Sequence, residues 1–434
     1  MNYSAAFIII LSALGGQTYA SEFSGTLSSQ TSYGIDSHQV QQQEWLLDLE
    51  YNAAFWGGDL TAIGRLRFDS VDELNRSHSE RPSNYASVNG PLASGADGEL
   101  ILRELYWDKA TDNIYWRLGK QQVVWGEADG LKLLDVINPQ SFREFVLDDF
   151  DDSRIPLWMV NAEITLGDDG LLQLLWIPDS TTHELAPASS DFALSSPLFV
   201  PAVPTVPTGI SLVLNEAVAP AAIIADSDFG MRYTTFAKGW DLSANYLYHY
   251  VDTPVTLTRS VDGSLEVDQR YYRSHLAGGT ASTALGDWIL RAELAFETDI
   301  NHRTTEPLPG VSQAHQWSSV VGLDWQGFTD QFISVQWFQR TIAGGREKRI
   351  AKKRENTVSF LWESKFANET LSLEWLHLHS TDHGDGLVQP EVRYNYEANL
   401  DIYLNAAVFY GDRKERFGQF DHADRIAFGF VWGF

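Results

Sequence analysis

The sequence predicts an all-β fold, a single antiparallel transmembrane β-barrel of about 18 strands like those of bacterial outer membranes. Three observations support this prediction. Segments of about ten residues with alternating polarity, the length a tilted strand needs to cross a bilayer, recur along the chain. Short turns and long connections alternate between these segments. The chain ends on a strand of alternating aromatic residues whose last member is Phe434.

The last strand, residues 425–434, separates large from small side chains with a period of two. Its large apolar residues share one face: Ile426, Phe428, Phe430, Trp432 and Phe434. The other face is mostly Ala, Gly and Val, which suits a strand between lipid and a crowded interior. The strand is similar to the terminal signal of outer-membrane barrels, so the barrel assembly machinery is an expected partner. Taken alone, it would also suit a soluble edge strand.

Residues 1–20 are predicted to be a signal peptide. They carry no charge, and their apolar run from Ala5 to Leu14 precedes the small-x-small pattern Thr18-Tyr19-Ala20. The run is well short of the roughly 20 residues of a membrane-spanning helix. We therefore expect the mature chain to begin at Ser21 and the barrel to occupy residues 21–434.

The composition excludes several classes of function. A net charge of −27 argues against nucleic acid as a partner, because phosphates attract basic surfaces. The absence of cysteine removes disulfides and thiolate chemistry. The chain has 15 Trp, 17 Tyr and 23 Phe, which suits aromatic girdles at the two membrane interfaces. Outer-membrane lipid and lipopolysaccharide are the partners that such a surface implies.

The alternating segments can be counted in order from the expected mature N-terminus. The predicted strands are 23–33, 43–55, 59–69, 99–109, 114–125, 157–166, 171–180, 228–238, 240–252, 270–285, 287–299, 315–327, 330–342, 355–367, 370–381, 388–399, 401–411 and 423–434. A tight turn rich in Gly, Asn or Asp follows each even-numbered strand before the last, and a longer connection follows each odd-numbered one. Short periplasmic turns that alternate with longer external loops are typical of a bacterial barrel. A soluble sandwich has no reason to keep this parity.

Charged residues occupy the face opposite the large apolar residues, as Arg65 and Arg67 do beside Leu66 and Phe68. An Arg or Lys on the lipid face costs about 2–4 kcal/mol at the bilayer midplane, so these charges are expected to face the lumen. The predicted pore-lining residues are Arg65, Arg67, Arg117, Gln121, Asn161, Glu163, Arg291, Glu293, Arg340, Arg393 and Glu397. They could set opposed fields across a pore, or pair to brace the wall. Segments 99–109, 114–125 and 370–381 break the alternation and have no predicted orientation at their outer ends.

The connection 126–156 is predicted to fold into the barrel as a constriction loop. Asn138 can cap a helix that begins at Pro139 and places Phe142, Phe145 and Val146 on one face. That apolar face must be buried from water, and the inside of the barrel mouth is where it can be buried. The residues expected to border the passage are Asp135, Asn138, Arg143, Glu144, Asp148 and Asp149. The Pro-rich connection 181–227 is expected to lie over the mouth or against the outer leaflet.

The end of the fifth predicted strand and the loop that follows it carry a recurrent motif. The two segments are Gly119-Lys120-Gln121 to Trp125-Gly126 and Asp135-Val136-Ile137-Asn138-Pro139. They resemble the core of a porin-like family of outer-membrane β-barrels of Gram-negative bacteria. Members carry a Gly-[Arg/Lys]-Gln…Trp-Gly strand end and an Asp-x-x-Asn-Pro loop. The clear match covers about forty residues, and the rest of the chain shares only the barrel pattern. The resemblance implies a porin-like fold.

No residue pattern points to catalysis, a metal or a cofactor. The acidic run that includes Asp148 and Asp149 lacks the spacing of an EF-hand loop, so a solvated or Arg-paired acidic face is favoured over a calcium site. His377, His379 and His383 could ligate zinc, although solvated or hydrogen-bonded histidines are commoner. Because no Gly-x-Ser-x-Gly signature occurs, an outer-membrane hydrolase is the least favoured alternative.

The function that these patterns favour is a porin-like outer-membrane channel for small or amphipathic solutes, with the loop 126–156 as its constriction. A barrel of about 18 strands leaves an interior wide enough for water unless loops fill it. The alternative is a closed barrel with a structural or surface-interaction role.

Overall fold

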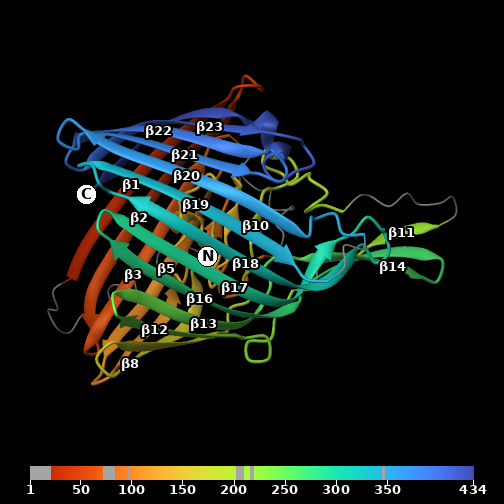
Figure 1. Cartoon of the computed structure of the whole chain (residues 1–434), viewed down its shortest axis with the longest axis horizontal. Helices are drawn as coiled ribbons and strands as arrows, with labels where there is room; N and C mark the ends of the chain where they lie inside the picture. Colours follow the sequence, from red (N-terminus) through yellow and green to blue (C-terminus); the bar gives the residue numbers. More distant parts are fainter. Residues whose placement is uncertain (1–20, 72–83, 96, 202–209, 216–218, 345–347) are drawn as a thin grey trace.

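The computed structural model describes residues 21–71, 84–95, 97–201, 210–215, 219–344 and 348–434, and the predicted signal peptide lies outside this range. Eighteen antiparallel strands form a closed barrel (Figure 1). The wall strands are β1(Ser21–Gly34), β2(Val40–Phe55), β3(Gly58–Asp69), β5(Gly98–Ala110), β6(Ile114–Gln121), β8(Leu157–Leu166), β9(Gly170–Ile177), β12(Asp228–Ala237), β13(Trp240–Tyr250), β16(Arg273–Leu285), β17(Trp288–Arg303), β18(Val311–Trp325), β19(Gln331–Ile342), β20(Arg354–Phe366), β21(Leu371–Ser380), β22(Gly386–Glu397), β23(Leu400–Tyr410) and β24(Arg425–Gly433). The predicted strand number and order are confirmed.

The first and last strands close the barrel. β1 pairs with β24 from Thr26 opposite Gly433 to Gly34 opposite Arg425. Beyond the ladder, the backbone amides of Gly25 and Phe434 each donate to the other's carbonyl at 2.9 Å. The predicted terminal strand is therefore part of a seam without free edges.

The short turns and the long connections lie at opposite ends of the barrel, as their alternation predicted. The C-terminus lies at the end with the short turns, and β11 and β14 project from the other end (Figure 1). The outer face carries exposed large apolar side chains, including Trp45, Leu66, Phe68, Trp317 and Trp337. A closed antiparallel barrel with this outer face is an outer-membrane protein. In the described ranges, no helix is long and apolar enough to span a membrane.

One broken alternation has a local cause in the structure. The ladder between β3 and β5 pairs Ile63 with Glu104 and Gly64 with Leu102, which leaves Arg103 as an extra residue. This β-bulge lets the side chains of Arg103 and Glu104 both reach interior partners. β6 ends at Gln121, four residues before the predicted end at residue 125, because the chain turns into the lumen there.

The loop that follows β6 lies inside the barrel, but its predicted helix does not form at Pro139. Ser141–Phe142 forms a short strand, β7, which pairs with β10(Glu184–Leu185), and tight turns follow it. Phe145 has φ of 57°, outside the right-handed helical region. The only α-helix of the described chain is the single turn α2(Phe150–Ser153). The apolar residues of the loop pack against several separate elements, which a regular helix face could not reach.

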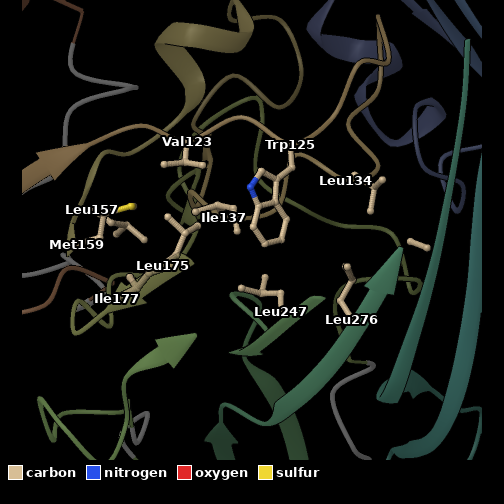
Figure 2. Packing of buried hydrophobic residues seen from close by; sticks show 11 residues of the cluster. Val123, Trp125, Leu134, Ile137, Leu157, Met159, Leu175, Ile177, Leu247 and Leu276 are labelled. Atoms are coloured by element: carbon tan, nitrogen blue, oxygen red, sulfur yellow. The ribbon is translucent and has the colours of Figure 1, made fainter. Parts of the chain in front are cut away.

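Two apolar clusters of buried residues lie where the loop meets the wall. Trp125 and Leu134 of the loop are fully buried and point toward Leu247 and Leu276 of the wall (Figure 2). The second cluster gathers loop, wall and mouth segments around η1(Gly418–Ala423). Its buried members are Phe192, Leu378, Leu387, Ala407, Phe409, Phe417, Phe420 and Ala423.

The Pro-rich connection divides between two places. Phe192 belongs to the second cluster, which agrees with the expected position over the mouth. β11(Ser211–Leu214) pairs with β15(Ser264–Arg270), which pairs with β14(Val255–Val261) in a small sheet outside the wall. The remaining short strand, β4(Ala93–Ser94), lies beside the start of β5.

Candidate functional site

Near the end of β6, just before the in-folded loop, lies a glycine that no other residue could replace without strain. Gly119 has φ of 134°, and a Cβ there would lie 2.1 Å from the carbonyl oxygen of Leu105. Beside it, the buried amide of Gln121 donates to the carbonyls of Arg117 at 3.1 Å and Met159 at 3.3 Å. These contacts hold the chain at the point where it turns from β6 into the lumen.

Asn138 and Asp135 tie the two ends of the loop together. The side chain of Asn138 accepts a hydrogen bond from the amide of Val123 at 2.8 Å and donates one to the carbonyl of Ile155 at 3.0 Å. Asp135 forms a buried ion pair with Arg154 at 2.8 Å. The motif residues thus close the base of the loop, and Asn138 does not cap a helix.

The loop is anchored to one side of the wall by β9, β17 and β19, and Gln336 supplies the β19 contact by accepting from the amide of Asp129 at 3.0 Å. The indole of Trp125 donates to Gln173 of β9 at 2.7 Å. The carboxylate of Glu293 accepts hydrogen bonds from two loop amides, those of residues 127 and 134. Arg291 forms an ion pair with Asp129 of the loop. The predicted lumenal residues Arg291 and Glu293 therefore hold the loop in place.

The loop reaches the opposite side of the wall at the barrel seam. Glu144 hydrogen-bonds to Gln42 of β2 and forms an ion pair with Arg425 of β24. The ring of Phe145 lies 4.6 Å from that of Phe420 in the mouth cluster. The loop consequently spans the lumen.

A cavity of about 470 Å³ lies beside the loop, against β1–β3, β5 and β20–β24. Its charged lining carries both signs. The basic residues are Arg65, Arg67, Arg103, Lys120, Arg154, Arg393 and Arg425. The acidic residues are Glu44, Glu99, Asp129, Glu144, Asp148, Asp149, Asp152, Glu184, Glu374 and Glu391. Of the predicted site residues, this cavity brings together Arg65, Arg67, Arg393, Glu144, Asp148 and Asp149.

Most of the arginines in this cavity are paired with carboxylates. Arg65 binds Asp48 through two hydrogen bonds of 2.7 and 2.6 Å, and also contacts Asp152 at 2.7 Å. Arg393 contacts Glu391 at 2.8 Å. Pairing braces the wall and at the same time leaves polar edges toward the cavity, so the two interpretations of the lumenal charges are compatible.

The other predicted pore residues lie elsewhere. Arg117, Asn161 and Glu163 border a second cavity of about 240 Å³ between β6, β8, β9 and β12, where Arg117 pairs with Asp108 at 2.8 Å. Arg340 borders a third of about 260 Å³. Glu397 is exposed at the end of β22. The predicted residues therefore do not form one continuous lining.

Arg143 is buried and does not border the large cavity. Its guanidinium lies 4.0 Å from Glu99 of β5. Gln121, Asp135 and Asn138 likewise act within the loop base, as described above. The predicted constriction residues that border the cavity are Glu144, Asp148 and Asp149, from the later part of the loop.

Burial shifts the pKa of several loop groups. Enclosure raises the pKa of Asp148 to about 8, and the nearby Glu144 and Glu44 add to the shift. Burial also raises the pKa of Asp149. For Asp152, burial acts upward, but Arg65 and Arg103 outweigh it and hold the pKa below its usual value. Asp148 is therefore protonated and Asp152 ionised near neutral pH, although both lie on one short loop.

Sequence reasoning missed several cavity residues. Arg103 and Lys120 fall in the strands whose alternation is broken, and the bulge that orients Arg103 depends on pairing with β3. Glu44 and Arg425 lie at strand starts and meet the loop only in the folded chain. The broken alternation of polarity in this segment could have indicated the site, because β-bulges often occur where a barrel wall redirects a side chain or ends its strand pairing.

The histidines that suggested a metal site have other partners. His377 and His379 share the hydroxyl of Tyr410, each at 2.8 Å. His383 lies between the carboxylates of Glu355 and Glu415, at 3.7 and 2.5 Å, and the nearby carboxylate of Glu355 contributes most to raising its pKa. Within the part of the chain that the structure describes, no group of three or more His, Asp or Glu side chains is arranged to hold a metal ion.

Several solved structures of bacterial proteins share this fold. OccK11 (OpdR) of Pseudomonas aeruginosa is 13% identical with a TM-score of 0.52, and 95% of each chain is covered. OccAB2 of Acinetobacter baumannii is 10% identical with a TM-score of 0.52, covering 95% of this chain and 98% of that one. OccK2 (OpdF) of P. aeruginosa, solved in complex with glucuronate, is 11% identical with a TM-score of 0.51, covering 96% and 99%.

These similarities show the barrel fold, and sequence comparison adds the family. No curated protein matches the sequence. A family model does match, over residues 46–430, which is most of the chain and nearly the whole barrel. The chain therefore belongs to the family described as protein of unknown function DUF1302.

Proposed function

We propose that this protein is an outer-membrane channel for small or amphipathic solutes, and that the loop 126–156 is its constriction. The observation that carries the proposal is the loop's path across the lumen. It is attached to β17 through Glu293 and to β24 through Arg425, with a charged cavity of about 470 Å³ at its side. A purely structural barrel has no need of such a polar cavity, since apolar packing stabilises an interior more simply.

The charges of the cavity favour solutes with polar or charged groups. Arg65 and Arg67 lie on the β3 side, and Glu374 and Glu391 lie on β21 and β22. Fixed charges that border a narrow passage select ions and orient dipolar solutes. The relative OccK2, whose structure holds glucuronate, is a protein of the same fold with a small charged solute bound. That likeness is consistent with a small-molecule solute here.

A closed barrel remains the second candidate because of one specific observation. The mouth cluster packs Phe145 of the loop against Phe409, Phe417 and Phe420, with ring centroids 4.6 to 6.4 Å apart. Water does not cross a packed aromatic cluster. A channel with this structure would conduct through the remaining charged side of the lumen or after movement of the cluster.

Single-channel conductance in planar bilayers separates the two candidates. The channel proposal expects discrete conductance steps from the purified protein. Deletion of residues 131–147 should raise the conductance several-fold because it removes the part of the loop beside the cavity. The deleted protein must remain heat-modifiable on gels, which shows that the barrel has folded. If it folds and its conductance and ion preference equal those of the intact protein, the loop is not the constriction. If the intact protein never conducts, the closed barrel is favoured.

A further inference from the structure

The barrel wall is interrupted beside β5. β5 pairs with β3 along Gly98–Asp108, but its ladder with β6 begins only at Leu105. β6 leaves the wall after Gln121, whose partner in the next strand is Leu157. Among the described residues, positions 101–104 of β5 consequently have no strand partner on the β6 side. In a membrane, unpaired backbone groups in the wall require another cover.

Residues 84–95, the cover segment, close this interruption. Near β8, Trp158 donates to the carbonyl of Val88 at 3.0 Å, and Asn89 donates to the carbonyl of Pro156 at 3.0 Å. Near β5, the amide of Leu92 donates to Leu100 at 2.8 Å, and β4 pairs with the same strand. The segment carries no charged residue, and Val88 and Leu92 are 60% and 56% exposed. Only Ala93 and Ser94 of this segment pair with a strand, and its other hydrogen bonds include those to Thr181.

The large cavity reaches the inner side of the cover segment. Tyr85 of the segment lines it, together with Ile101 of β5 and with Ile155 and Pro156 at the end of the loop. On the outer side, an apolar groove of about 600 Å³ runs beside β4 and is lined by Trp45, Leu66, Phe68, Leu100 and Ala93, among others. Arg67 and Glu99 border both spaces. One layer of wall therefore separates a lipid-facing groove from a charged interior.

Lys120 places a positive charge at this boundary. It lines the cavity, is only 3% exposed, and its ammonium donates to the carbonyl of Leu102 at 2.6 Å, in the unpaired part of β5. No carboxylate of the described residues lies within 4.0 Å of it, whereas Arg65 and Arg67 both have such partners. A buried ammonium with no carboxylate in direct contact is costly and favours binding of a carboxylate.

We propose that the cover segment closes a lateral port between the outer leaflet and the cavity, and that the port admits anionic single-chain amphiphiles of the fatty-acid class. The alkyl chain lies in the apolar groove before passing under the segment, and the carboxylate binds Lys120. The inference rests on the proposed channel function, because the cavity is the common path, and it names the class of amphipathic solute.

Photolabelling tests the port directly. The probe is dodecanoate with a diazirine on its alkyl chain, added to the protein in liposomes, and labelled peptides are identified by mass spectrometry. We expect labels on Trp45 or Leu100 in the groove and on Ile101 or Ile155 under the cover segment. Lys120→Gln should reduce labelling under the segment several-fold, and should not affect labelling by the corresponding fatty alcohol. Lys365→Gln, at the exposed end of β20, is the charge control.

Engineered disulfides test whether the segment must move, since the native chain has no cysteine. Asn89→Cys with Thr181→Cys replaces a side-chain contact of 3.0 Å, and Ala93→Cys with Leu100→Cys replaces a cross-strand pair. Oxidation should abolish labelling under the segment, and dithiothreitol should restore it. Ala281→Cys with Ala292→Cys, a cross-strand pair in the continuous wall, should have no effect. If the variant that carries both disulfides does not fold, the variant with Ala93→Cys and Leu100→Cys alone is used for the same measurement.

Conductance measured on the same samples keeps the two proposals apart. Loss of labelling on oxidation with unchanged ion conductance supports a port separate from the axial path. Equal labelling under the segment in the oxidised and reduced protein overturns the port, and so does labelling confined to the outer groove in both. Equal labelling by the fatty acid in Lys120→Gln overturns the anionic class. Absence of conductance in all samples would instead refute the channel, and the labelling would still decide the port.

Discussion

Glu144, at the centre of the in-folded loop, forms a buried ion pair with Arg425, the first residue of the last wall strand. The same carboxylate accepts a hydrogen bond from Gln42 of β2. The loop is thus bound at the seam where β24 and β1 close the barrel, and closure of the wall and placement of the loop depend on each other.

Replacing Glu144 by Ala should destabilise the barrel. The guanidinium of Arg425 would remain buried without a partner, and breaking a buried pair in this way costs about 3–5 kcal/mol. The temperature at which the folded band disappears on gels should fall. Glu144→Ala combined with Arg425→Met should recover part of the loss, because no unpaired charge remains. An unchanged transition in Glu144→Ala would show that the pair does not contribute to stability.

The protonation of Asp148 should make ion selectivity depend on pH. Its pKa is raised to about 8, so the carboxyl is neutral below that pH and charged above it. Cation preference, measured as a reversal potential, should increase as pH rises through 8. Because the folded state binds the proton more tightly than the unfolded state, the contribution to stability is present at low pH and is lost as pH rises toward 8. Asp148→Asn should remove the selectivity step, and a step that persists in this variant would assign it to another group.

The pair of Arg393 and Glu391 offers matched substitutions of opposite sign on one strand. Both side chains line the cavity and lie 2.8 Å apart. Arg393→Gln should shift ion selectivity toward cations, and Glu391→Gln should shift it toward anions, because each leaves its partner's charge facing the passage. Reversal potentials under a salt gradient measure both. If both substitutions shift the reversal potential in the same direction, the ion path does not run beside this part of β22.

Gly119 should tolerate no side chain. In Gly119→Ala, the new Cβ would meet the Leu105 carbonyl at 2.1 Å, and its φ of 134° is strained for any residue but glycine. We expect the yield of heat-modifiable barrel to fall. Gly64→Ala in β3 is the control, since a Cβ there has no atom within 4 Å. Equal yields for both variants would contradict the role assigned to Gly119.

Deletion of Phe434 should reduce assembly in the outer membrane. Its backbone makes two hydrogen bonds to Gly25 across the seam, and the terminal aromatic strand is the expected contact of the barrel assembly machinery. The amount of folded protein in outer-membrane fractions measures the effect. Trp56→Ala, which removes an exposed aromatic at a short turn, should assemble normally. Full assembly of the deleted chain would remove the reason for treating this strand as a signal.

The positions that sequence reasoning placed wrongly share a physical cause. The helix expected from Pro139 fails because Phe142 packs on His183 while Phe145 packs on Phe420, in different directions. Glu397 was assigned to the lumen by continuing an alternation that ends at the register shift between Asn395 and residue 397. In both cases the prediction extends a regular sequence spacing beyond the point where contacts with distant segments determine the backbone conformation.

The sequence by itself determined the barrel, its strand number, the parity of its turns and the lumenal side of most strands. These features follow from a local alternation, because lipid on one face penalises every misplaced charge. Only the tertiary structure decided which charges meet around the cavity, how Glu144 finds Arg425, and why the wall beside β5 needs a cover. Those contacts join residues far apart in the chain, and no local period encodes the distances between them.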